Sequence, residues 1–114
     1  MHTLAQLRSG ELKGTARLTL SEGLTSFPEE IFDLADSLEI LDLSNNLLCE
    51  LPDLGRLTHL KIAFFSNNRF TSFPSSFKNC TNLYMVGFKN NQIETFGENI
   101  LPETISWLIL TDNR

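Results

Sequence analysis

The chain has 114 residues, of which 41% are hydrophobic, and a formal net charge of −5 at pH 7, so it is long enough for one folded domain. This acidic balance disfavours nucleic acid as a partner, because domains that bind nucleic acid carry clustered positive charge. No stretch approaches the ~18 consecutive apolar residues of a membrane helix, so we also expect no membrane partner.

The first expected element is a short amphipathic helix over residues 2–12. Leu4, Leu7 and Leu12 lie on one side of it, and Gly10 or Gly14 is available to end it. The start of the chain lacks the apolar run of about 7–15 residues that marks a secretory signal peptide. We therefore expect an intracellular, cytoplasmic protein.

Beyond this helix, one pattern returns along the rest of the chain. It is clearest in residues 38–52, LEILDLSNNLLCELP, where leucines hold the first, fourth and sixth positions and Asn46 the ninth. The pattern recurs after 22, 23 and 22 residues, which places Asn68, Asn91 and Asn113 at the same position. Each unit is too short to bury its own apolar side, so neighbouring units must stack and share a core.

The spacing L-x-x-L-x-L-x-x-N-x-L resembles that of the leucine-rich repeat family, over residues 15–114. The resemblance implies an α/β horseshoe, a solenoid with about five parallel strands on its concave side and short helical turns and coil on its convex side. We expect a capping helix over 1–14, repeats over 15–37, 38–59, 60–82 and 83–104, and a partial repeat over 105–114.

Alternation with a period of two inside each repeat predicts strands with one buried side. The predicted inward pairs are Leu41 with Leu43, Ala63 with Phe65, Val86 with Phe88, and Leu108 with Leu110. A second set of large apolar residues, one per repeat, is predicted to fill the convex half of the core: Phe27, Leu51, Phe73 and Phe96.

The asparagines at the ninth position are interpreted as structural. A side-chain amide offers two donors and an acceptor, so it can satisfy backbone groups that a bend leaves unpaired. Stacked repeats would align these residues in a ladder made of Asn46, Asn68, Asn91 and Asn113.

The residues between the inward positions are predicted to face the open concave side. Several are large and apolar, which favours a surface that contacts a protein or peptide. The alternative is that β-branched and aromatic residues simply suit strands. The predicted partner-binding residues are Ile40, Asp42, Ile62, Phe64, Tyr84, Met85, Trp107 and Ile109.

Charge is sorted along the sequence. Residues 22–53 contain nine acidic side chains and no basic one, whereas residues 54–93 contain five basic side chains and no acidic one. Such runs usually mark solvated surface. They also predict that adjacent repeats present opposite electric fields, which would orient a charged partner.

No catalytic motif of the G-x-S-x-G, H-E-x-x-H or P-loop type occurs in the sequence, so we expect no catalytic residue. Cys49 and Cys80 occupy different repeats at non-equivalent positions and are interpreted as reduced, structural residues. His2 and His59 are isolated in the sequence. We therefore expect no metal site and no cofactor.

Two segments, MHTLAQLRSGELKG and ILPETISWLILTDNR, look like parts of the N-terminal repeat region of bacterial leucine-rich-repeat protein kinases. That resemblance implies a longer parent protein with a catalytic domain after Arg114, although none of the kinase motifs occurs in this sequence. Leu108 and Leu110 would then leave an apolar C-terminal flank, through which the chain could self-associate.

The leading hypothesis is a protein–protein interaction module that binds a protein or peptide on its concave face. The alternative is the N-terminal sensing or scaffold region of a larger bacterial serine/threonine protein kinase. Both hypotheses place the function of these residues in contacts with another molecule or domain and not in catalysis.

Overall fold

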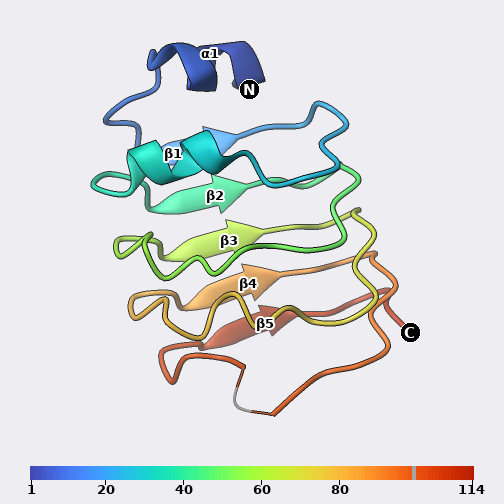
Figure 1. Cartoon of the computed structure of the whole chain (residues 1–114). Coiled ribbons are helices and arrows are strands. Elements are labelled where there is room, and N and C mark those ends of the chain that lie inside the picture. The colour runs from blue at the N-terminus through green and yellow to red at the C-terminus, as the bar shows by residue number, and fades with distance from the viewer. Residues whose placement is uncertain (99) are drawn as a thin grey trace.

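The computed structural model describes residues 1–98 and 100–114; residue 99, inside the predicted repeat 83–104, lies outside the described residues. Five parallel strands stack side by side in chain order in one sheet (Figure 1). They are β1 (Arg17–Thr19), β2 (Ile40–Asp42), β3 (Ile62–Phe64), β4 (Met85–Gly87) and β5 (Trp107–Ile109). The predicted solenoid of parallel strands is confirmed.

The strand register aligns equivalent residues of successive repeats. Leu41 lies beside Leu18 on one side and Ala63 on the other, and Val86 lies beside Ala63 and Leu108. The first four of these residues are fully buried, whereas Leu108 on the last strand is half-buried. A one-residue slip would have turned the core residues outward, so the register follows from the hydrophobic pattern.

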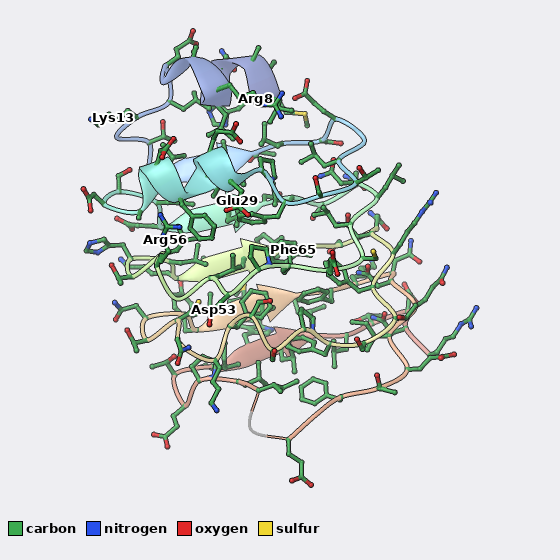
Figure 2. All side chains as sticks on the ribbon, in the orientation of Figure 1. Arg8, Lys13, Glu29, Asp53, Arg56 and Phe65 are labelled. Atoms are coloured by element: carbon green, nitrogen blue, oxygen red, sulfur yellow. The ribbon has the colours of Figure 1, made fainter. Side chains whose placement is uncertain are left out.

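Phenylalanines fill the core of the later repeats. Phe65, labelled in Figure 2, stacks on Phe88 with ring centroids 5.2 Å apart, and Phe70 meets Phe88 edge-on at 5.0 Å. The prediction for Phe96 is wrong, because this side chain is 45% exposed. It packs against Phe73 at 4.7 Å, while its other side is open to solvent.

The N-terminal helix α1 (Leu4–Ser9) is shorter than the predicted span of 2–12. Thr3 begins it with a capping box shared with Gln6, and Gly10 ends it at φ 82°, in the left-handed region that suits glycine. No helix in residues 1–98 or 100–114 is long and apolar enough to cross a membrane.

α1 lies beyond β1 at the N-terminal end of the stack (Figure 1). Leu7 on the helix and Leu12 after it are buried in the same core as the strands. His2 bonds to the strand edge itself, because its backbone N–H donates to the Thr19 carbonyl at 3.0 Å. The capping function assigned to residues 1–14 stays a prediction.

On the side of the solenoid opposite the strands, regular helix is confined to η1 (Glu29–Leu34), a 3₁₀ helix in the first repeat, among the described residues. Ile31 and Leu34 face inward from η1 as expected and are buried. The corresponding segments of later repeats are turns and coil, so of the predicted short helical turns and coil the helical part is not confirmed there. Gly55 and the pair Ser75 and Ser76 in those segments have lower helix propensity than the residues of η1.

Candidate functional site

The sheet face opposite the core, called the open face below, consists of two columns of side chains that alternate with the core residues. One column contains Arg17, Ile40, Ile62, Met85 and Trp107, and the other contains Thr19, Asp42, Phe64, Gly87 and Ile109. Seven of the eight predicted partner-binding residues lie in these columns, and Tyr84 directly precedes β4. The structure therefore brings together residues that are up to 69 positions apart, from Ile40 to Ile109.

Solvent reaches this face, and most strongly at its aromatic residues. Trp107 is 60% exposed and Tyr84 is 40% exposed. The remaining predicted residues are half-buried by their neighbours: Ile40, Asp42, Ile62, Phe64, Met85 and Ile109. Over β3, β4 and β5 both columns are apolar, whereas over β1 and β2 they also contain Arg17, Thr19 and Asp42.

Gly87 shapes the open face and was not among the predicted site residues. It is buried although it lies on the open face, because the Phe64 ring covers it. A Cβ atom placed on Gly87 would lie 2.9 Å from Cδ1 of Phe64 and 3.9 Å from Cβ of Ile109. The absence of a side chain thus lets the ring lie across β4 toward β5, and Phe64, Gly87 and Ile109 form a continuous apolar shelf. The signal available in the sequence is a glycine at the strand position where the other repeats have a side chain.

The charged groups of the open face lie at its edges. Lys61 and Glu39, just before β3 and β2, form an exposed ion pair with Nζ 3.2 Å from Oε1. Asp42 accepts a hydrogen bond from the Ser44 backbone N–H at 3.0 Å and has no ion-pair partner among the described residues. Lys89, just beyond β4, is exposed.

The four predicted ladder asparagines hold the backbone where each repeat turns away from the sheet. Asn68 is representative: Oδ1 accepts the Leu48 N–H at 2.9 Å, and Nδ2 donates to the carbonyls of Leu43 and Phe65, both at 3.0 Å. Asn46 makes the corresponding bonds to the irregular first repeat, where it accepts the N–H groups of Glu22 and Leu24. These bonds join neighbouring repeats, so they fix the spacing of the strands below the open face.

A second asparagine column, absent from the sequence prediction, runs along the exposed edge of the same turn. Asn45, Asn67 and Asn90 adopt left-handed φ angles of 63°, 56° and 56°. Nδ2 of Asn67 donates to Oδ1 of Asn45 at 2.7 Å, and Nδ2 of Asn90 donates to Oδ1 of Asn67 at 2.6 Å. Asparagine tolerates this conformation better than most residues. The recurring Asn-Asn pairs were the signal in the sequence.

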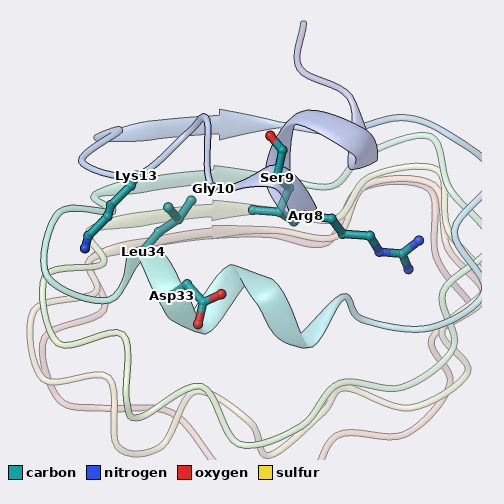
Figure 3. A pocket seen from close by; sticks show the side chains of 7 residues that line it. Arg8, Ser9, Gly10, Lys13, Asp33 and Leu34 are labelled. Atoms are coloured by element: carbon teal, nitrogen blue, oxygen red, sulfur yellow. The ribbon is translucent and has the colours of Figure 1, made fainter.

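A groove of about 400 Å³ lies between α1 and η1 (Figure 3). Leu7 and Leu34 line it together with Lys13 and Asp33, while the neighbouring Arg8 forms an exposed ion pair with Glu30 at 3.4 Å. All of its polar side chains are solvated. It is the seam between the helix and the first repeat.

Neither cysteine belongs to a reactive cluster. Cys80 is buried, and its thiol donates to the Leu54 carbonyl at 3.4 Å, as expected of a structural residue. Cys49 is exposed, so its predicted structural role is wrong. Within residues 1–98 and 100–114, no group of three or more His, Cys, Asp and Glu side chains is arranged to hold a metal ion.

Solved structures of other proteins resemble this fold. The chain is similar to a leucine-rich repeat (LRR) protein of Leptospira interrogans, with a TM-score of 0.79 and 29% identity over 94% of this chain and 28% of that chain. It is also similar to YopM from Yersinia enterocolitica, with a TM-score of 0.58 and 26% identity over 96% of this chain and 27% of that chain. No protein-family model matches the sequence.

These similarities support a leucine-rich repeat fold for the chain. The chain spans little more than a quarter of the length of either neighbour. The finer resemblance to kinase-associated repeats stays a prediction from the sequence.

Proposed function

We propose that the chain is a protein-interaction module that binds a protein or peptide on the open face of its sheet. The observation that carries this proposal is the contiguous set Phe64, Met85, Trp107 and Ile109, held in register over β3, β4 and β5. Trp107 is 60% exposed at the edge of this set. Tryptophan and tyrosine are the residue types that most often dominate binding energy in protein contacts.

The backbone beneath this surface supports binding without rearrangement. Successive strands are fully paired, and the buried asparagines lock the turn that follows each strand. The backbone of paired strands is already ordered before a partner arrives, so the entropic cost of ordering the backbone on binding is low. The curvature of repeat solenoids creates extended concave surfaces that these proteins use for binding, which agrees with this role.

Alanine variants of the open face test the proposal. A partner captured by the wild-type chain is purified and titrated by calorimetry against Phe64→Ala and Trp107→Ala. We expect each variant to keep its circular dichroism spectrum and to lose at least ~1–2 kcal/mol of binding free energy, because each removes an aromatic side chain from the proposed contact.

Phe96→Ala is the matched control, since it removes the same ring from an exposed position beside Phe73 and away from the sheet. It should bind like wild type. If Phe64→Ala and Trp107→Ala also bind like wild type, the apolar residues only fill the strands and the binding site lies elsewhere.

A further inference from the structure

We infer that the segment bound by the open face presents a large apolar side chain to the Phe64–Gly87–Ile109 shelf and, beside it, an arginine or lysine to Asp42. This inference rests on the proposed function and specifies the chemistry of the partner. It follows from the division of the open face into an apolar part over β3, β4 and β5 and a charged part over β1 and β2.

The shelf is shaped for an apolar group. Because Gly87 has no side chain, the Phe64 ring lies over the β4 backbone, with its Cδ1 atom 2.9 Å from where a Cβ would be. The ring therefore occupies the space that a Gly87 side chain would need, and Phe64 itself remains half-buried. Ile109 continues the shelf on β5, and Met85 and Trp107 border it in the neighbouring column.

Asp42 supplies the charge at the edge of the shelf. It lies directly beside Phe64 in the strand register and two positions after Ile40 in the sequence. One oxygen, Oδ1, accepts the Ser44 N–H, and Asp42 forms no ion pair with any described residue. Glu39 on the same repeat differs, because Lys61 already neutralises it at 3.2 Å. A half-buried carboxylate next to apolar surface binds best to a cationic side chain that can both pack and hydrogen-bond.

Lys89 favours the Asp42 end of the shelf for the cation. It lies just beyond β4, where it would repel a cationic side chain of the partner. Arg17 lies on the adjacent strand β1, opposite Ile40, and makes no ion pair with Asp42. A bound segment therefore has its basic residue over β2 and its apolar residue over β3, β4 and β5, running along the stack of strands.

Selection from a phage-displayed library of random peptides, followed by titration of the synthetic peptides, tests this inference. We expect the selected peptides to combine a large apolar residue with an adjacent arginine or lysine. Asp42→Asn should weaken them about threefold to tenfold and reduce the dependence of their affinity on salt, because a charge pair is lost. Asp36→Asn, which removes the same charge from an exposed site outside the sheet, should leave the affinity unchanged.

Gly87→Ala should also weaken the peptides about tenfold, because the new methyl group displaces the Phe64 ring. In a Phe64→Ala background, the same Gly87→Ala change should have no further effect, since the ring is already absent. This cycle separates the shape of the shelf from any general effect on the fold, which circular dichroism checks for every variant.

The outcomes separate this inference from the proposed function. Peptides that bind but are insensitive to Phe64→Ala and Trp107→Ala, or a selection that enriches no binder, would contradict the proposed function and with it the inference. Peptides that depend on both aromatic residues but lack a basic residue, or bind Asp42→Asn as tightly as wild type, would overturn the inference alone.

Discussion

Single side chains join the repeats of this chain, and Asn68 illustrates how. Its amide satisfies one backbone N–H, from Leu48, and two carbonyls, from Leu43 and Phe65. Leu43 and Leu48 belong to the preceding repeat and Phe65 to the same one, so the side chain joins two units of the stack. In residues 1–98 and 100–114, no buried side-chain nitrogen or oxygen lacks a hydrogen-bond partner.

Asn68→Ala should therefore lower the free energy of unfolding by roughly 1–3 kcal/mol, because it leaves buried backbone groups without partners. Lys78→Ala, an exposed change on the opposite side of the solenoid, should alter it by less than about 0.5 kcal/mol. Chemical denaturation measures both. Equal effects of the two substitutions would show that the buried asparagine column contributes no special stability.

The two cysteines should differ sharply in reactivity. Burial, with a smaller contribution from the negative charge of Asp53, raises the pKa of the Cys80 thiol from 9.0 to about 12. The folded thiol thus holds its proton more tightly than the unfolded one. This stabilises the fold at pH values below 9.0, and the contribution is lost as the pH rises toward about 12.

At mildly alkaline pH, iodoacetamide should add one group to the folded protein, at the exposed Cys49, and a second only after unfolding. Mass spectrometry of the native and denatured protein counts the adducts. Rapid modification of Cys80 in the native state would mean that the core around Leu54 opens readily.

At the scale of elements, the sequence predicted the strands well because each one repeats a buried pattern. Once Leu41 and Leu43 point inward, alternation determines the direction of Asp42, and the same logic places Trp107 outward. The prediction for Phe96 failed because its exposure depends on which neighbours cover it and not on its position in the pattern. The position of the Phe64 ring over Gly87 was missed for a related reason. It depends on the absence of a side chain at Gly87 on the adjacent strand.

Helix α1 should depend on a few buried leucines. A helix of six residues is not stable alone, so its packing on the first repeat must hold it. Leu7→Ala should destabilise the protein by about 2–5 kcal/mol, because Leu7 is only 4% exposed. Leu47→Ala, at an exposed leucine, is the matched control and should have little effect in denaturant titrations. A small loss for Leu7→Ala would show that α1 is detached from the core in solution.

At the scale of the whole molecule, repeats that follow one another in the sequence lie side by side in the stack. The radius of gyration is 13.2 Å, which matches the ~13 Å expected of a compact domain of this length. Because successive repeats add one strand each (Figure 1), the acidic stretch at 22–53 precedes the basic stretch at 54–93 along the chain that builds the stack. A bound segment that runs along the stack meets these stretches in turn, which gives it a preferred direction.

Trp107 offers the most direct measurement of the binding role of the open face. It is the only tryptophan in the chain and is 60% exposed on that face. Its fluorescence can be followed while the wild-type protein is titrated with the captured partner or a selected peptide, with calorimetry confirming saturation. We predict that emission shifts to shorter wavelength and that quenching by acrylamide falls, because the indole ring leaves water for an apolar contact. Saturated binding with unchanged emission and unchanged quenching would contradict the assignment of the open face as the binding site.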